Sequence, residues 1–139
     1  MAEKTIDIAS PILSRNERLA DQLRQRFKET GTYVINVLSS PGSGKTTTIL
    51  GTNERLRDKA GLCCAVIEGD IASDVDAITM KEAGMPAIQI NTGGLCHLEG
   101  NMIMEAVDAF DQAVGLENID VIFIENVGNL VCPVDFDLG

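Results

Sequence analysis

The feature that most constrains this chain is a glycine-rich segment, Ser39–Thr46 (SSPGSGKT), between two regular patterns. Tyr33–Leu38 before it is rich in residues that favour strands, and a helix is predicted over Lys45–Ala60 after it. Gly42 and Gly44 let the backbone curl so that successive N–H groups point at an anion, and the helix adds the positive end of its dipole. A strand, such a loop and a helix together predict a phosphate-binding site.

The end of this loop has the functional groups that a nucleotide and its metal ion require. Lys45 is predicted to reach the β- and γ-phosphates, and the Thr46 hydroxyl to bind Mg²⁺. The full set predicted to bind the nucleotide is Gly42, Ser43, Gly44, Lys45, Thr46, Thr47 and Gly128. Ser39 stands where the general motif has its first glycine, so the match is imperfect. The alternative is a flexible turn before a helix that happens to begin Gly-Lys-Thr.

Strands and helices alternate along the rest of the chain. An apolar stripe at every fourth position predicts a helix over Asn16–Phe27 that ends at Gly31. Further strands are predicted over residues 62–67, 87–90 and 119–124, and further helices over 74–83 and 98–114. Because these strands are almost wholly apolar, we expect an α/β fold, a parallel sheet with flanking helices on both faces. The predicted organisation is an N-terminal helical segment, residues 1–30, and a nucleotide-binding domain, residues 31–139.

Two acidic residues that follow predicted strands are candidates to hold a magnesium ion. Asp70 comes after the second strand, close behind Glu68, and Glu125 follows the fourth. Ligands of parallel α/β sheets bind beyond these carboxyl ends, and Mg²⁺ is usually held partly through water. We therefore predict that Asp70 and Glu125 hold Mg²⁺ with Thr46, and that Lys45, Asp70 and Glu125 are catalytic. The N–H of Gly128 is predicted to contact the γ-phosphate. Carboxylates that only cap the following helices are the alternative.

Cys96, His97 and Cys132 form a candidate site for a transition metal. Thiolate and imidazole groups suit Zn²⁺, Ni²⁺ or Cu⁺. Their spacing is not that of a zinc finger, and ordinary loop residues are the alternative interpretation. Both segments are predicted to lie at the edge of the sheet that binds phosphate, and a symmetric dimer would bring two such sets together around one axis. Cys63 and Cys64 lie in an apolar run and are predicted to be packed side chains.

The charge distribution excludes one class of function. The net charge is −10. Residues 1–81 contain all 11 Lys and Arg and 11 of the 21 Asp and Glu, so the charged side chains of residues 82–139 are all Asp or Glu. Nucleic-acid binding needs clustered positive charge, which this chain lacks. The acidic half is interpreted as a solvated surface, or as one that attracts cations or a basic partner. No apolar run is long enough to span a membrane, and Met1–Thr5 is no secretory leader, so a cytoplasmic location is expected.

Taken in order, these residues resemble the HypB family of nickel-inserting GTPases, hydrogenase maturation factors of the SIMIBI class of P-loop proteins. The matching stretches are Asn36–Thr47, Glu68–Asp70, Gln89–Leu98 and Ile124–Leu138. Ser39 in place of glycine is usual in that family. The resemblance implies a homodimer that binds GTP with Mg²⁺ and Ni²⁺ or Zn²⁺. It also implies GTP hydrolysis coupled to nickel delivery to the large-subunit precursor of a NiFe-hydrogenase, with the nickel accessory protein HypA as a partner.

The same resemblance implies roles for individual residues. Lys45, Thr46, Asp70 and Glu125 would serve the nucleotide and Mg²⁺, and Cys96, His97 and Cys132 would bind nickel or zinc. The chain has one histidine and no cysteine before Cys63, so it lacks the N-terminal nickel-binding clusters of some relatives. Any nickel site is therefore expected in the nucleotide-binding domain.

The family's Asn-Lys-x-Asp motif, which recognises guanine, is absent from these 139 residues. We therefore expect the chain to correspond to the N-terminal part of such a protein, a C-terminally incomplete P-loop domain that keeps phosphate contacts but loses guanine selectivity. GTP hydrolysis is what the resemblance implies, and an inactive fragment is the alternative. Two alternatives remain open: a nickel or zinc metallochaperone fragment that acts without nucleotide, and another SIMIBI-class NTPase such as a urease accessory GTPase. The last does not explain Cys96-His97 together with Glu125–Cys132.

Overall fold

A parallel four-stranded sheet forms the centre of the computed structural model, which describes residues 9–39, 44–69, 74–95, 97–127 and 137–139. The strands are β1 (Tyr33–Val37), β2 (Cys64–Glu68), β3 (Ala87–Gln89) and β4 (Val121–Glu125). Their order across the sheet is β1-β4-β2-β3, so the last strand in the sequence lies between the first two. The predicted α/β fold with a parallel sheet is confirmed.

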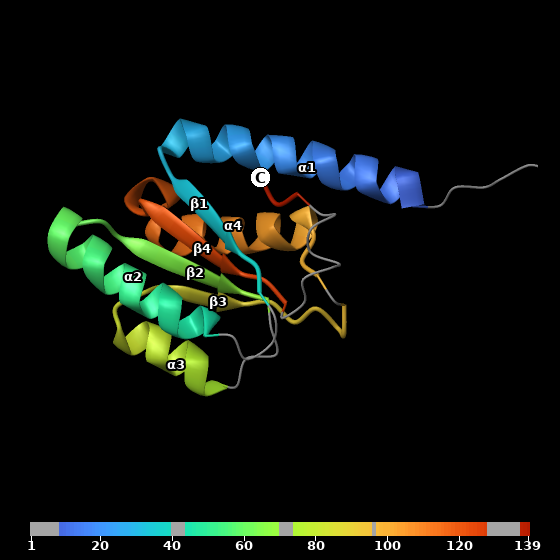
Figure 1. Ribbon diagram of the computed structural model, residues 1–139. Coiled ribbons are helices and arrows are strands. Elements are labelled where there is room, and N and C mark those ends of the chain that lie inside the picture. The colour runs from blue at the N-terminus through green and yellow to red at the C-terminus, as the bar shows by residue number, and fades with distance from the viewer. Residues whose placement is uncertain (1–8, 40–43, 70–73, 96, 128–136) are drawn as a thin grey trace, which may run out of the picture.

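Helices cover both faces of this sheet (Figure 1). The helices α1 (Ala9–Thr30) and α4 (Gly100–Val114) lie on one face, and α2 (Lys45–Ala60) and α3 (Asp74–Glu82) on the other. A single 3-10 turn, η1 (Leu116–Asn118), connects α4 to β4. None of the helices in the described ranges is both long and apolar enough to cross a membrane.

Two hydrophobic cores hold these layers together, and alternate residues of the central strands supply them. Ile67, Ile122 and Ile124 pack with Leu23 and Phe27 of α1 and with one side of α4. On the other face, Val66 and Phe123 pack with Ile49 of α2 and Met80 of α3. Because β2 and β4 are buried on both faces, almost every residue in them is apolar, as the sequence predicted.

The first strand differs from this expectation. Tyr33 is 76% exposed and Ile35 is 42% exposed, although both belong to an apolar run. Among the described strands β1 pairs only with β4, so one of its edges and much of its side-chain surface face solvent. The predicted cover on both faces is thus complete for β2 and β4 but only partial for β1, where Val34 packs against one core and Val37 against the other.

Element boundaries agree closely with the sequence patterns where glycine ends an element. The helix α1 ends at Thr30 before Gly31, which has φ +70°, and α2 spans the predicted Lys45–Ala60. The N–H of Gly61 donates to the carbonyl of Arg57 at 3.1 Å and closes α2. The helix α1 begins at Ala9, earlier than the apolar stripe indicated. The division of the chain at residue 30 stays a prediction.

The prediction that Cys63 and Cys64 are both packed side chains is right for Cys64 and wrong for Cys63. The strand β2 begins at Cys64, which is 4% exposed, and its burial raises the pKa of the Cys64 thiol, with smaller contributions from Asp120 and Cys63. Cys63 precedes the strand and is exposed. Its N–H donates to Oδ2 of Asp120 at 2.8 Å, which fixes the backbone where the chain enters the sheet.

Candidate functional site

The predicted site residues fall into two groups. The structure describes Gly44, Lys45, Thr46, Thr47, His97 and Glu125. The others, Gly42, Ser43, Asp70, Cys96, Gly128 and Cys132, lie outside the described residues, so their roles stay predictions. The described members come from the start of α2, the end of β4 and the segment before α4, which all lie at the carboxyl edge of the sheet (Figure 1).

The start of α2 buries a positive charge. Gly44 caps the helix with φ +91° and ψ +27°, a left-handed conformation that favours glycine, and its carbonyl accepts hydrogen bonds from Thr48. Lys45 follows and is only 7% exposed. An ammonium group buried at the positive end of a helix dipole is unfavourable unless anions lie nearby. This position therefore suits a lysine that contacts phosphate. Thr47, which is also predicted to contact the nucleotide, is exposed.

A hydrogen bond joins the predicted magnesium ligands from α2 and β4. The Thr46 hydroxyl donates to Oε1 of Glu125 at 2.9 Å, across 79 positions of sequence. Glu125 is the last residue of β4 and is 6% exposed. A hydroxyl and a carboxylate are the hard oxygen ligands that Mg²⁺ prefers, so the pair fits this ion. Of the three predicted magnesium ligands, the structure brings these two together.

Glu68 is a second buried carboxylate at this edge, and it was not predicted as a site residue. It ends β2, is 1% exposed, and lies opposite Glu125 in the register of the two parallel strands. Two carboxylates on neighbouring strands repel each other in a dry environment, which favours a cation between or beside them. The signal in the sequence was an apolar run that ends in an acid, but the pairing of β2 with β4 was needed to recognise it.

Asn126 connects three segments around the site, and no sequence pattern had indicated it. Its side chain is fully buried. The amide nitrogen donates to Oδ1 of Asn36 in β1 at 3.2 Å. The amide oxygen accepts from the N–H groups of Leu98 at 3.3 Å and Val127 at 2.8 Å. The residue next to Glu125 is thus bonded directly to the residue next to His97.

The segment that contains His97 is held tightly on both sides. Leu98 is fully buried, and a Cβ at Gly69 would lie 2.5 Å from its side chain, so any larger residue at position 69 would force Leu98 to shift. At the start of α4, the Gly100 N–H donates to Oδ1 of Asn16 at 2.6 Å. The other side of the Asn16 amide donates to the carbonyl of Asp137 at 2.7 Å. The segment before α4 is therefore fixed by β4, α1 and residues 137–139.

The transition-metal site is described only in part. The His97 imidazole is 12% exposed, and its Nε2 lies 3.2 Å from Oε1 of Glu99. Within the ranges that the structure describes, no three His, Cys, Asp or Glu side chains lie close enough together to hold a metal ion. Two of the three predicted ligands, Cys96 and Cys132, lie outside those ranges. The set of Cys96, His97 and Cys132 stays a prediction.

Comparison with known proteins identifies the family of this chain. Residues 33–137 match the family described as CobW/HypB/UreG, nucleotide-binding domain. The chain belongs to the CobW/HypB/UreG family. Its fold is accordingly that of a P-loop nucleotide-binding domain, and the resemblance inferred from the motifs is confirmed.

Individual members of the CobW/HypB/UreG family are similar over almost the whole chain. The hydrogenase/urease maturation factor HypB of Helicobacter hepaticus is 44% identical over 137 residues, which are 99% of this chain and 55% of that protein. The hydrogenase maturation factor HypB of Escherichia coli K12 is 46% identical over 136 residues, which are 98% of this chain and 45% of that protein. The chain spans about half the length of the curated relatives it matches.

Two solved structures of the family have the same fold. HypB from Helicobacter pylori in complex with nickel gives a TM-score of 0.79 at 42% identity. The match covers 90% of this chain and 56% of the Helicobacter pylori chain. HypB from Archaeoglobus fulgidus gives a TM-score of 0.80 at 39% identity. The match covers 91% of this chain and 58% of the Archaeoglobus fulgidus chain. A nucleotide-binding domain of this family is therefore present.

Proposed function

We propose that this chain binds GTP with Mg²⁺ at the carboxyl edge of its sheet and takes part in GTP hydrolysis that is coupled to nickel insertion into a hydrogenase large-subunit precursor. The observation that carries the proposal is the 2.9 Å hydrogen bond between Thr46 and Glu125, directly beside the buried Lys45. The bond joins a hydroxyl and a carboxylate, and the ammonium-bearing Lys45 directly precedes Thr46 at the end of the glycine-rich sequence. These are the groups that a nucleoside triphosphate and its metal ion need.

Each residue has a definite task in this proposal. Lys45 binds the β- and γ-phosphate oxygens, while Thr46 and Glu125, with Asp70, hold Mg²⁺ directly or through water. The ion, when bound, neutralises negative charge on those oxygens. In hydrolysis water attacks the γ-phosphorus and the bond to the β-phosphate oxygen breaks, giving GDP and phosphate. The predicted contact of Gly128 with the γ-phosphate is then lost.

The proposed cargo site is Cys96, His97 and Cys132, which would bind Ni²⁺, with Zn²⁺ as a competitor for the same ligands. The hydrogen bond from Leu98 to Asn126 supports a connection between this segment and the nucleotide, because Asn126 adjoins Glu125. A shift of the residues after Glu125 on hydrolysis would change the position of His97. We propose that nucleotide occupancy controls nickel affinity in this way.

The proposed partners follow the names of the relatives. Those from Helicobacter hepaticus and Escherichia coli are hydrogenase maturation factors, the first also a urease maturation factor. We propose a cytoplasmic protein that forms a homodimer on GTP or metal binding and acts with the accessory protein HypA on the hydrogenase precursor. Because the chain spans about half of those relatives, the partner sites on the longer protein belong to the proposal as well.

The nucleotide part is tested by titration with a fluorescent GTP analogue in the presence of Mg²⁺. Thr46→Ala is expected to weaken binding at least about tenfold, a loss of about 1.4 kcal/mol, because the variant loses one metal ligand. Thr52→Ala is the matched control, since its hydroxyl only donates to the carbonyl of Thr48 in the same helix, at 2.8 Å. Equal weakening by both variants, or by neither, would overturn the assignment.

The same titration separates the alternatives. Firm Ni²⁺ or Zn²⁺ binding together with equally weak GTP and ATP binding would indicate a metallochaperone that acts without nucleotide. Nucleotide binding without any effect of Cys96→Ser on nickel affinity would indicate another NTPase of the class. Cys63→Ser is the control for a cysteine substitution as such, because Cys63 is exposed and lies at the other edge of the sheet.

A further inference from the structure

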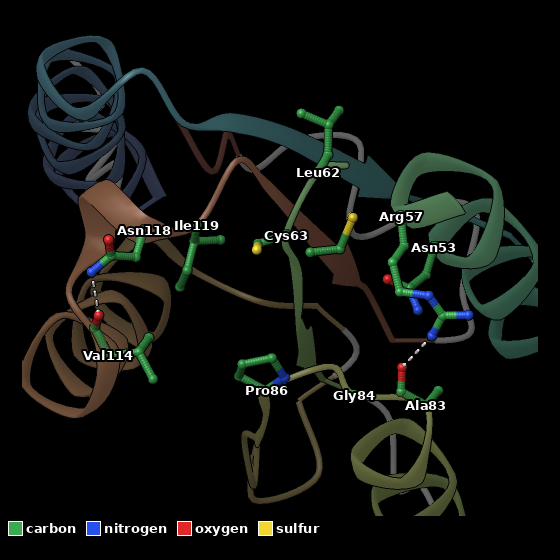
Figure 2. Close-up of a pocket in the computed structure, with 11 residues that line it drawn as sticks. Asn53, Arg57, Leu62, Cys63, Ala83, Gly84, Pro86, Val114, Asn118 and Ile119 are labelled. Atoms are coloured by element: carbon green, nitrogen blue, oxygen red, sulfur yellow. Dashed lines mark hydrogen bonds between the residues drawn. The ribbon is translucent and has the colours of Figure 1, made fainter. Parts of the chain in front are cut away.

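A cavity of about 270 Å³ lies at the amino edge of the sheet (Figure 2). Thr46 and Glu125 lie at the opposite edge. Leu62, Cys63 and Cys64, where the chain enters β2, line one part of the cavity, and residues at or near the C-terminal ends of α2, α3 and α4 line the rest. Its lining residues are Asn53, Arg57, Leu62, Cys63, Cys64, Ala83, Gly84, Pro86, Val114, Asn118 and Ile119. The proposed nucleotide and nickel chemistry uses none of them.

Asn53 gives this cavity a polar group that a ligand would have to satisfy. Its side chain lines the cavity, the residue is only 4% exposed, and its amide has no hydrogen bond within the part of the chain that the structure describes. By contrast, the amide of Asn118 in the same lining donates to the carbonyl of Val114 at 2.7 Å. The Asn53 amide therefore faces the water of the cavity, and a ligand that displaces this water must offer the amide a donor and an acceptor in its place.

The surroundings of Asn53 define the chemistry of that molecule. Leu62, Pro86, Val114 and Ile119 provide an apolar wall. Arg57 is the one charged side chain among the described lining residues, and it already donates to Asp58 at 3.1 Å and to the carbonyl of Ala83 at 3.3 Å. Three helices end around the cavity, and the negative ends of their dipoles disfavour an anion. The dipoles disfavour an anion and the Arg57 guanidinium disfavours a cation, so the ligand is uncharged and largely apolar.

We propose that this cavity binds a small, uncharged molecule with an apolar body and an amide or lactam edge that pairs with the Asn53 amide. A primary amide presents one donor and one acceptor side by side, and an amide or lactam edge matches both. At about 30 Å³ per water molecule, the cavity has room for about nine waters, or for a single ring with an amide substituent.

Cys63 supplies a direct measure of occupancy. It is exposed and lines the cavity, whereas Cys64 beside it is 4% exposed. A ligand in the cavity shields the Cys63 thiol from a small alkylating reagent. The rate of alkylation falls in proportion to the unoccupied fraction, about tenfold when the ligand is present at ten times its Kd.

The test uses the whole chain, iodoacetamide as reagent and benzamide as probe, with alkylation of Cys63 measured by peptide mass spectrometry. We expect benzamide to slow alkylation of the wild type and of Asn101→Leu, an exposed control on α4, but not of Asn53→Leu. Benzoate, the anion of similar shape, is expected to protect less. Absence of protection in the wild type, equal protection in Asn53→Leu, or stronger protection by benzoate would overturn the proposal.

A second measurement covers the case in which Asn53→Leu fails to fold. In the wild type labelled with nitrogen-15, benzamide is expected to shift the side-chain amide signal of Asn53 with the same concentration dependence as the protection of Cys63. An unmoved Asn53 signal under conditions that protect Cys63 would contradict pairing with this amide.

Discussion

The amide oxygen of Asn126 accepts a hydrogen bond from the backbone N–H of Leu98 at 3.3 Å, although 28 positions separate the two residues. Asn126 follows Glu125, which ends β4 beside the glycine-rich loop, and Leu98 follows His97. The bond is buried, so water cannot replace either partner if it breaks. It connects the segment that ends the proposed triphosphate site directly with the segment of the proposed metal site.

Removal of this connection is expected to be costly. Asn126→Ala leaves the N–H groups of Leu98 and Val127 and the amide of Asn36 without their partner, and we expect it to lower the free energy of unfolding by about 2–4 kcal/mol. Urea denaturation measures the change. Asn101→Ala, on the exposed side of α4, serves as the control and should change it by less than about 0.5 kcal/mol. Equal effects of the two variants would contradict the role given to Asn126.

Alanine substitutions at Gly69 and Gly51 are expected to change the free energy of unfolding in opposite directions. A Cβ at Gly69 would lie 2.5 Å from the Leu98 side chain, so Gly69→Ala is expected to destabilise the chain by about 1–3 kcal/mol. Gly51 lies inside α2, and a Cβ there would have nothing within 4 Å, so Gly51→Ala should stabilise by up to about 1 kcal/mol. Thermal unfolding of both variants checks the signs, and destabilisation by Gly51→Ala would refute the packing described for α2.

Asn16 is expected to fix the start of α4 relative to residues 137–139. Asn16→Leu loses the hydrogen bonds to Gly100, at 2.6 Å, and to Asp137, at 2.7 Å, and we expect a loss of about 1–3 kcal/mol in urea denaturation. Hydrogen exchange at the Gly100 amide should accelerate by more than the global loss of stability explains. Gln22→Leu, exposed on the same helix, is the control. Unchanged exchange at Gly100 would count against this clamp.

Asp111 predicts a specific pH dependence. The backbone N–H of Leu116, at 2.9 Å, and the guanidinium of Arg26 lower the pKa of Asp111 in the folded chain. A lowered folded pKa gives stability that is present above the unfolded value of about 3.9 and is lost as the pH falls through the folded value. Asp111→Asn should therefore be less stable than the wild type at pH 7, and the difference should shrink towards about pH 3. A pH-independent difference in melting temperature would contradict this.

Local patterns were sufficient for the elements but not for the site. The boundaries of α2 follow from Gly44, which precedes the helix, and Gly61, which follows it. Both glycines adopt left-handed conformations that do not continue an α-helix. The partnership of Glu68 with Glu125 depends instead on β4 inserting between β1 and β2, which no single segment encodes. Asn126 was missed for the same reason, since its three partners come from β1, from the segment before α4 and from its own neighbour.

The exposure of Cys63 and β1 has a different physical origin. An apolar run predicts burial only when neighbouring elements cover it, and the strand β2 begins one residue after Cys63. Tyr33 and Ile35 lie on a strand with one described neighbour, so their apolar side chains remain accessible. Composition could not distinguish these residues from the equally apolar β4.

The central claim, that nucleotide occupancy changes the affinity of the metal site, is tested most directly by calorimetric titration of Ni²⁺ with and without a non-hydrolysable GTP analogue and Mg²⁺. Couplings of this kind are about 1–3 kcal/mol, so we expect the nickel Kd to change by at least about fivefold, with a reciprocal change in nucleotide affinity when nickel is present. A nickel Kd that is the same with and without bound nucleotide would contradict the account.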